Sequence, residues 1–340
     1  MHLLVGNPTA QSGRAAGRID EARHLLWAAS VPHDFLATQP EGRTVTETAA
    51  AVATGRYSAV IAMGGDGTFA EVAKGLLQAG AAVPMAMLPT GTANDQGKSF
   101  GLESGEDDLA RNVQVIADGH TVPLDGGRIF AFDTFDQPLG ADWFFDSAGW
   151  GFSALVLRMR NEDRRLVAGV PILRELYRDQ AVYAGAILRA FALAAVQEQP
   201  FEAEVTTAAG PVFYEGVTDL IVKNTRIYAG AWVLDPTASP EDGEMELVPF
   251  RGRDEMLARG VMDHQEVPLN AEHFEAVGVQ LTPALRAANF DIRLLPRPLA
   301  QPVESQIDGE EWMRAERFRV EVVRHALRLV VPRSLDGHPE

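Results

Sequence analysis

A glycine-rich segment that contains one aspartate, Gly-Gly-Asp-Gly-Thr at residues 64–68, follows a short apolar run. The run at 59–63 has the composition of a buried strand, and Thr68 is expected to begin a helix. Glycine lets backbone N–H groups approach an anion, and a helix N-terminus adds a favourable dipole, so the segment predicts a phosphate-binding loop. A carboxylate such as Asp66 beside phosphate groups indicates a divalent cation between them. A tight turn capped by the aspartate is the alternative.

A second polar loop, Pro-Thr-Gly-Thr-Ala-Asn-Asp at residues 89–95, follows the next expected strand. It adds the carboxylate of Asp95 at the sheet edge where Asp66 lies. Two carboxylates facing one site repel each other unless a cation or a proton separates them. A P-loop at 92–99 is disfavoured because Thr92 replaces its first glycine. A helix cap formed by Asn94 and Asp95 is a further alternative.

Strands and helices alternate in the first third of the chain. Apolar runs predict strands at 2–5, 33–37, 59–63 and 83–88, and helical patterns predict helices at about 14–29, 44–54, 68–79 and 107–117. This alternation indicates a doubly wound, mainly parallel, Rossmann-like domain, in which ligands bind at the carboxyl ends of the strands. Both glycine loops are expected at that edge.

Strands dominate beyond Asp125. They are expected at 128–132, 142–147, 201–207, 212–222, 244–249, 290–294 and 318–331. One helical stretch at 154–197 interrupts them, with a break expected at 169–171. The fold class is therefore α/β followed by β, with a C-terminal β-sandwich-type domain and an inserted helical stretch.

Composition narrows the function classes. The 340 residues suggest two domains of an ordinary globular protein, and no apolar run is long enough to cross a bilayer. With no cysteine and no His-Glu-x-x-His motif, any metal should be bound by oxygen, which favours magnesium. A net charge of −17 disfavours nucleic acid as a partner. A cytoplasmic location is expected, because the start of the chain has no signal-peptide pattern.

The inserted helical stretch is locally basic. Between Leu155 and Ala190, seven arginines outnumber four acidic residues. A solvated helix face is the default interpretation, and contact with a membrane surface is the alternative.

Two acidic turns lie later in the chain, Ser-Pro-Glu-Asp-Gly-Glu at 239–244 and Gln-Ile-Asp-Gly-Glu at 306–310. Asp-Gly is a common turn dipeptide, so each segment alone indicates a turn rather than a site.

Five stretches together resemble the diacylglycerol kinase catalytic-domain family, whose relatives include sphingosine and ceramide kinases. They are Asn7-Pro8 with Ser12-Gly13, Gly64-Gly65-Asp66-Gly67-Thr68, Gly91-Thr92-Ala93-Asn94-Asp95, Ala238 to Gly243, and Ile307-Asp308-Gly309-Glu310. The two middle stretches are the specific signal, because NAD kinases and phosphofructokinases share only the first of them.

The resemblance implies an ATP-binding domain at 1–125, a lipid-substrate domain at 126–324, and a final segment near 325–340 that returns to the first domain. It implies transfer of the γ-phosphoryl group of ATP to the hydroxyl of diacylglycerol or a similar lipid alcohol at the inner face of a membrane, with Mg²⁺ as cofactor. A homodimer is left open.

The resemblance also assigns residues. Asp308 would be the general base, and Asp66, Asp95 and Asp125 would hold the catalytic magnesium. A second, structural magnesium would be held by Asp242, Ser239 and Glu244. The nucleotide contacts would be Asn7, Thr38, Gly64, Gly65, Asp66, Gly67, Thr68, Phe69, Ala70, Thr92 and Asn94.

The sequence departs from the family pattern in the second domain. Glu241 precedes Asp242 where a pair of aspartates is more frequent, and Ala229-Gly230-Ala231 stands where consecutive glycines are common. Two other functions remain: a kinase of a soluble substrate, as in NAD kinases, and a nucleotide-binding regulator without catalysis.

Overall fold

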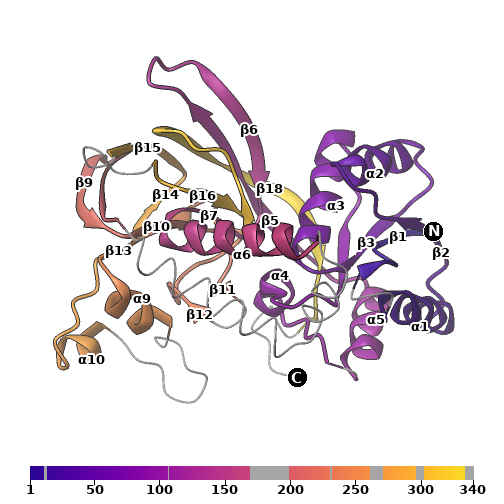
Figure 1. Cartoon of the computed structure of the whole chain (residues 1–340). Coiled ribbons are helices and arrows are strands. Elements are labelled where there is room, and N and C mark those ends of the chain that lie inside the picture. The colour runs from indigo at the N-terminus through magenta and orange to yellow at the C-terminus, as the bar shows by residue number, and fades with distance from the viewer. Residues whose placement is uncertain are drawn as a thin grey trace.

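The computed structural model describes residues 1–10, 14–105, 107–168, 199–229, 232–260, 271–295 and 302–333. The chain forms an α/β part and a β-rich part, joined by one long sheet (Figure 1). The elements of the α/β part are β1 (His2–Gly6), α1 (Arg14–Ala28), β2 (His33–Ala37), α2 (Arg43–Ala53), β3 (Ala59–Gly64), α3 (Asp66–Ala79), β4 (Met85–Pro89), α4 (Asp95–Ser99) and α5 (Asp108–Asp118).

The β-rich part follows in the chain. Its elements are β5 (Thr121–Phe132), β6 (Pro138–Phe144), β7 (Ser147–Gly151), α6 (Phe152–Ala168), β8 (Phe201–Thr207), β9 (Gly210–Val217), β10 (Asp219–Lys223), β11 (Ile227–Tyr228), β12 (Trp232–Val233), β13 (Met245–Phe250), α9 (Arg253–Gly260), α10 (Ala271–Glu275), β14 (Leu285–Ala287), β15 (Asn289–Leu295), β16 (Ser305–Ile307), β17 (Glu310–Glu311) and β18 (Arg317–Val330).

The α/β part is doubly wound. Strands β2, β1, β3 and β4 lie parallel in that order. Successive side chains of a strand point to opposite faces, so Leu4 and Ile61 pack on the side of α1 and α5, whereas Leu3 and Val60 pack on the side of α2 and α3. Because both faces are covered, the inner strands β3 and β4 contain no polar side chain.

The β-rich part is a sandwich. A six-stranded sheet, in the order β14-β13-β10-β7-β16-β17, packs against the β18-β15-β8-β9 end of the long sheet. Their shared core contains Trp150 and Leu247 from the smaller sheet and Phe290 and Phe318 from the larger one. The predicted fold class, an α/β part followed by a β-sandwich, is confirmed.

Strands β5 and β18 form an antiparallel ribbon that belongs to both parts. At one end Leu329 of β18 pairs in parallel with Met85 of β4, and at the other end Phe318 pairs with Ile292 of β15. The ribbon therefore connects the α/β strands to the sandwich within one hydrogen-bonded sheet (Figure 1).

Two segments expected as single strands are each divided between the two sheets. The expected strand at 142–147 ends in the long sheet at Phe144, and β7 begins in the smaller sheet at Ser147. The expected strand at 212–222 is likewise divided at Thr218. Each prediction of one strand was wrong because the apolar pattern continues through the crossing, although the strand's partners change.

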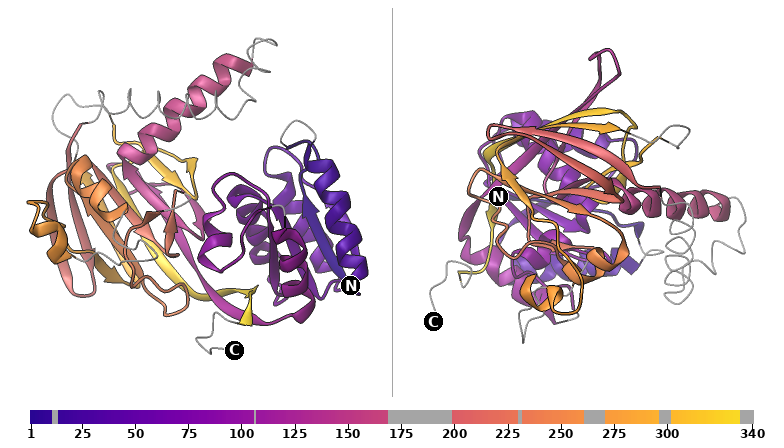
Figure 2. Two further views of the ribbon diagram at one scale, coloured as in Figure 1. Left: turned by 90° about the horizontal axis from the view of Figure 1, so that it is seen from below. Right: turned by 90° about the vertical axis from the view of Figure 1, so that its left-hand side faces the viewer.

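The helical stretch was expected at 154–197. Helix α6 begins slightly earlier, at Phe152, and extends away from the two sheets (Figure 2). The expected break at 169–171 lies outside the described residues, as do Ser12, Gly13, Gly230 and Ala231.

Candidate active site

The loops predicted to bind phosphate follow the carboxyl ends of four parallel strands. Asn7 follows β1, Thr38 follows β2, Gly65 follows β3, and Thr92 lies in the loop after β4. The side chain of Asn7 accepts hydrogen bonds from the backbone N–H and the hydroxyl of Thr9, at 3.0 and 2.8 Å. The parallel topology therefore brings these residues to one edge of the sheet.

The two glycine loops interlock. A Cβ atom added at Gly91 would lie 2.4 Å from the Cα atom of Gly65, so neither loop has room for a side chain at this contact. Asn94 adopts a left-handed conformation with φ of 55° and fixes the second loop. Its amide accepts the N–H of Gly91 and donates to the carbonyl of the same residue, both at 2.9 Å.

A small pocket is lined by both loops, with Gly64 and Asp66 on one side and Asn94 and Gln96 on the other. The carboxylate of Asp66 accepts the backbone N–H of Gln96 at 3.2 Å. The side-chain amide of Gln96 is 2% exposed, and neither its oxygen nor its nitrogen has a hydrogen-bond partner within the described part of the chain. A buried amide in this state is available to a ligand or a water molecule in the pocket.

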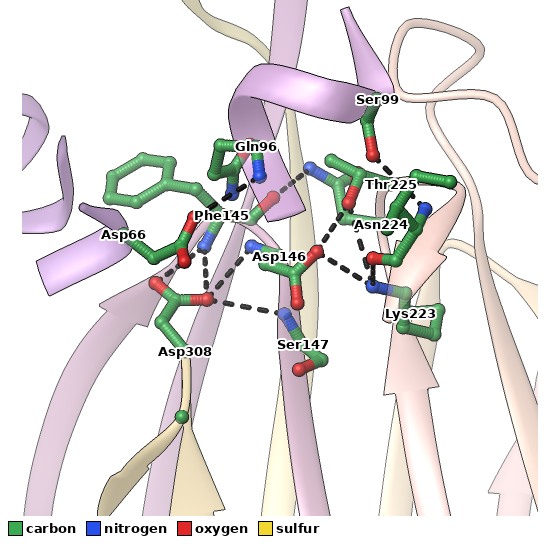
Figure 3. Close-up of polar contacts among 12 residues, drawn as sticks. Asp66, Gln96, Ser99, Phe145, Asp146, Ser147, Lys223, Asn224, Thr225 and Asp308 are labelled. Carbon is green, nitrogen blue, oxygen red and sulfur yellow. Dashed lines mark hydrogen bonds and ion pairs between the residues drawn. The ribbon is translucent and has the colours of Figure 1, made fainter. Parts of the chain in front are cut away.

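Asp308 occupies the tight turn between β16 and β17. Asp308 and Gly309 both have positive φ, 46° and 78°, as a two-residue hairpin turn of this hand requires. The Asp308 carboxylate accepts backbone N–H groups from Phe145 at 3.0 and 3.1 Å, Asp146 at 2.8 Å and Ser147 at 3.2 Å (Figure 3). The turn thus holds its carboxylate against the segment that crosses between the two sheets.

The crossing segment also contacts the first glycine loop. The rings of Phe69, in the first turns of α3, and Phe145 pack edge to face with their centroids 5.9 Å apart. The carboxyl groups of Asp66 and Asp308 point toward one another in Figure 3. Residues that are distant in the sequence therefore meet beside the pocket.

Asp146 is anchored in the protein interior. Its carboxylate is 2.6 Å from the ammonium nitrogen of Lys223, which is 1% exposed, and it accepts a hydrogen bond from the hydroxyl of Thr225. The amide of Asn224 donates to the carbonyls of Phe145 and Asp125, both at 2.8 Å. Strand β10 and the residues after it therefore fix the crossing segment whose N–H groups hold Asp308.

Asp66, Asp146 and Asp308, called here the central carboxylates, interact electrostatically. Burial, followed by the negative charge of Asp146, raises the pKa of Asp308 to about 7, although the three backbone N–H donors act in the opposite direction. Burial and the charge of Asp146 also raise the pKa of Asp66. Ionisation of all three carboxylates is therefore unfavourable without a further positive charge.

Asp125 lies elsewhere, in β5, and is fully buried. One carboxylate oxygen accepts the N–H of Gly243 and the other accepts the N–H of His325, both at 2.6 Å. His325, with φ of 51°, lies in the irregular part of β18. Both oxygens of Asp125 thus hold backbone segments together.

The loop that contains Ser239, Asp242 and Glu244 precedes β13. Asp242 and Glu244 form ion pairs with Arg286 of β14. This loop touches Asp125, because the backbone N–H of Asp125 donates to the carbonyl of Pro240 at 2.7 Å. The structure therefore groups these residues with Asp125.

Phe69 and Ala70 bury their side chains in the core of the α/β part. The N–H of Phe69 donates to the carbonyl of Gly65 at 3.1 Å, as in an ordinary helix. The side chains of both residues therefore serve the core of the α/β part. Gly67 is exposed in the first turn of α3, and Thr68 is partly exposed.

Among the described residues, no group of three or more His, Cys, Asp and Glu side chains is arranged to hold a metal ion. Mg²⁺ in phosphate-binding sites usually takes one or two carboxylates together with water and substrate phosphates. Asp66 and Asp95, which flank the glycine loops, fit that pattern, and a cation there would relieve the mutual repulsion of the central carboxylates. Asp125, whose oxygens accept the N–H groups of Gly243 and His325, lies instead with the loop that precedes β13.

Comparison with known proteins points to the same family that the glycine-loop motifs resemble. Residues 1–129 match the family model for the diacylglycerol kinase catalytic domain. This part of the chain, more than a third of its length, is similar to that family.

Two similar proteins are both named diacylglycerol kinase. A diacylglycerol kinase of Mycobacterium tuberculosis is 30% identical over 206 residues, which are 58% of this chain and 56% of that protein. A diacylglycerol kinase of Staphylococcus epidermidis is 31% identical over 126 residues, which are 37% of this chain and 39% of that protein. The matches thus span only part of the length of these relatives.

The fold similarity extends over nearly the whole chain. The crystal structure of a diacylglycerol kinase from Bacillus anthracis superposes with a TM-score of 0.67 at 16% identity and covers 98% of this chain and 97% of that one. At this identity the similarity establishes the fold alone. No helix in the described ranges has the length and apolar character needed to cross a membrane.

Four residues near the site, Gln96, Asp146, Lys223 and Thr225, were not predicted from the sequence. Asp146 was hidden inside a segment expected to be one continuous strand. The only available signal for Lys223 was the scarcity of lysine, with just three in the whole chain. No local pattern pairs Lys223 with Asp146, because the two are joined only by the pairing of β7 with β10.

Proposed function

We propose that the protein is a lipid kinase that transfers the γ-phosphoryl group of ATP to the hydroxyl of diacylglycerol or a similar lipid alcohol. One observation carries the proposal: the carboxylate of Asp308, held by the N–H groups of residues 145–147, faces Asp66 of the glycine loop. A protein that only bound a nucleotide would not need a second carboxylate with a raised pKa at this position.

In this proposal the nucleotide phosphates lie against the backbone N–H groups of the first glycine loop. Thr38, Asn7, Thr92 and Asn94 complete the edge that surrounds them. Phosphoryl transfer depends mainly on positioning and on neutralising charge, which backbone N–H groups and a cation can supply without a catalytic lysine. Asp66 and Asp95 would hold Mg²⁺, which when bound neutralises charge on the transferring phosphoryl group.

Asp308 would act as the general base. Its carboxylate would accept the proton of the lipid hydroxyl as that oxygen attacks the γ-phosphorus and the bond to the β-phosphate oxygen breaks. A base with a pKa near 7 is about half deprotonated at neutral pH and binds the proton strongly enough to remove it. The backbone N–H donors fix the direction of the carboxylate.

The experiment offers labelled ATP and Mg²⁺ with diacylglycerol, monoacylglycerol, ceramide and NAD in parallel, and uses Asp66→Ala as the blank. Labelled diacylglycerol or another labelled lipid, absent from the blank, is the expected result. Labelled NAD would instead assign a soluble substrate, as in the NAD kinases. ATP binding without transfer to any acceptor would contradict the proposed kinase activity.

We further propose that the enzyme reaches its lipid by peripheral contact with the inner face of the membrane through the basic helical stretch that includes Arg164 and Arg165. Its excess of arginine over acidic residues supports an attraction to anionic lipid in an otherwise acidic chain. The change of both arginines to glutamate should reduce flotation with vesicles that contain phosphatidylglycerol. Unchanged flotation would remove this contact surface from the proposal.

We also propose the division of the chain into a nucleotide domain at 1–125 and a lipid domain at 126–324, with the last segment packed on the first domain. Pairing of Leu329 with Met85 supports the return of the chain to the α/β part. The β5–β18 ribbon would then act as the connection between the domains.

A further inference from the structure

Arg286 lies among three carboxylates at the loop where the family resemblance implied a second magnesium. Its Nη2 pairs with the carboxylate of Asp242, and its Nε lies 3.1 Å from Glu244 and 3.4 Å from Glu246. Asp242, Glu244 and Glu246, called here the loop carboxylates, therefore all contact one guanidinium group.

The strand register places Arg286 at this position. Residues 246 and 286 are direct partners in the antiparallel pair of β13 and β14. Directly opposed residues have their Cβ atoms close enough for side-chain contact. The planar guanidinium has several N–H donors in a fixed arrangement, so it can serve more than one carboxylate at once.

Glu246 makes this contact important for stability. Its side chain is 1% exposed, and neither carboxylate oxygen has a hydrogen-bond partner among the described residues. Exposed ion pairs, such as that of Glu244, whose side chain is 47% exposed, contribute little to the free energy of unfolding. Removal of the partner of a buried carboxylate is more costly, because the group must either stay charged without compensation or bind a proton, and burial already raises the pKa of Glu246 to about 7.

Hydrogen bonds within the protein fix the conformation of the loop at residues 239–246. The second oxygen of Asp242 accepts the N–H of Glu244 at 2.9 Å, and the neighbouring N–H of Gly243 is bound by Asp125. The carbonyl of Pro240 is bound by the N–H of Asp125. Two of the three expected magnesium ligands, Asp242 and Glu244, thus already pair with Arg286, so the expected donor set does not fit a second magnesium.

We infer that Arg286 is an internal cation that holds the loop at residues 239–246 in place of a structural divalent metal. The loop keeps its conformation without Mg²⁺. The loop is in turn connected to the β5–β18 ribbon by Asp125, whose carboxylate accepts the N–H of Gly243 in the loop and the N–H of His325 in β18. The inference does not depend on the identity of the phosphate acceptor.

Thermal unfolding without nucleotide tests this role, and Asp66→Ala in every sample removes the other proposed magnesium site. The Asp66→Ala protein should have the same Tm in EDTA and in millimolar Mg²⁺. Adding Arg286→Met, which keeps much of the apolar stem but no charge, should lower Tm in EDTA by roughly 5 °C and allow Mg²⁺ to restore part of it. Adding Asp242→Asn to that protein should abolish the recovery, whereas Arg286→Lys should retain part of the stability without Mg²⁺.

Two results would overturn the inference: a Tm of the Asp66→Ala protein that rises with Mg²⁺, or a Tm that does not change when Arg286 is replaced by Met. If the Met variant does not fold, hydrogen exchange of residues 239–246 in the Asp66→Ala protein decides the question. Equal protection in EDTA and Mg²⁺ supports the internal cation, and protection that is lost in EDTA contradicts it.

Discussion

The central carboxylates and the loop carboxylates are alike in composition, since each set has three acidic side chains and one basic residue, but the positive charge is distributed differently. In the loop set, Arg286 contacts all three carboxylates. In the central set, Lys223 pairs with Asp146, and no ion pair within the described residues reaches Asp66 or Asp308. Each loop carboxylate thus has a cationic partner in the protein, whereas Asp66 and Asp308 have none among the described residues and favour a cation brought with a nucleotide.

The position of the cation explains this difference. The side chain of Lys223 is 1% exposed, and its ammonium group also donates to the carbonyl of Ile227 at 2.7 Å. A compact ammonium bound in this way serves one carboxylate, whereas a partly exposed guanidinium can reach several. A count of charges therefore does not identify a metal site, because the reach of the internal cation decides which carboxylates remain unpaired.

The largest expected effect comes from removing a central carboxylate that has no internal cation. Asp66→Ala should lower phosphoryl transfer about a thousandfold, because a cation that neutralises charge in the transition state is worth several kcal/mol. Steady-state kinetics over a range of Mg²⁺ concentrations measures this loss. Asp20→Ala, at an exposed position of α1, is the control. If the Asp66→Ala variant retained a tenth of the activity, Asp66 would not hold an essential cation, and the proposed difference between the central and the loop carboxylates would be wrong.

A smaller effect is expected where the glycine loops support the central set. In Gly91→Ala the new methyl group would meet the Cα atom of Gly65 at 2.4 Å, so the loops must separate. Overpacking of this kind costs about 1–3 kcal/mol, and ATP affinity measured by calorimetry should fall about tenfold. Gly17→Ala, where a Cβ meets nothing within 4 Å, is the matched control. Equal affinities for the two variants would show that loop contact is unimportant.

The smallest effect concerns charge within the central set. Asp308 must be deprotonated to act as a base, and its pKa of about 7 predicts that activity falls as the pH drops below 7. The paired change Asp146→Asn with Lys223→Met removes a negative charge that raises this pKa and leaves no unpaired lysine. The acidic limb of the kcat/KM profile should then move down by about one pH unit. A limb that stayed in place would show that Asp146 does not influence Asp308.

Much of the α/β part could be predicted from the sequence because its signals are local. The loop at 64–68 and the loop at 89–95 each follow a strand and precede a helix, and parallel topology brings them to one edge. The interlocking of Gly65 and Gly91 needed the structure, since it depends on the distance between neighbouring strands.

The rest of the site depends on long-range pairing. The segment at 145–147 becomes a set of N–H donors only because the chain leaves one sheet and enters another there, and a periodic apolar pattern does not mark such a crossing. The partner of Asp146 is set by strand pairing, and the partner of Asp242 by the register of β14. A motif resemblance gave Asp242 a metal but could not show that Arg286 lies beside it.

In the proposed mechanism, Asp308 removes the proton from the lipid hydroxyl at the nucleotide site. Its most direct test compares the wild-type protein with Asp308→Asn in single-turnover transfer from labelled ATP to diacylglycerol, with ATP binding measured on the same samples. We expect labelled lipid from the wild type, a transfer rate at least about a hundredfold lower in the variant, and ATP affinity within a factor of three. Transfer by the Asn variant at close to the wild-type rate would contradict the proposed mechanism.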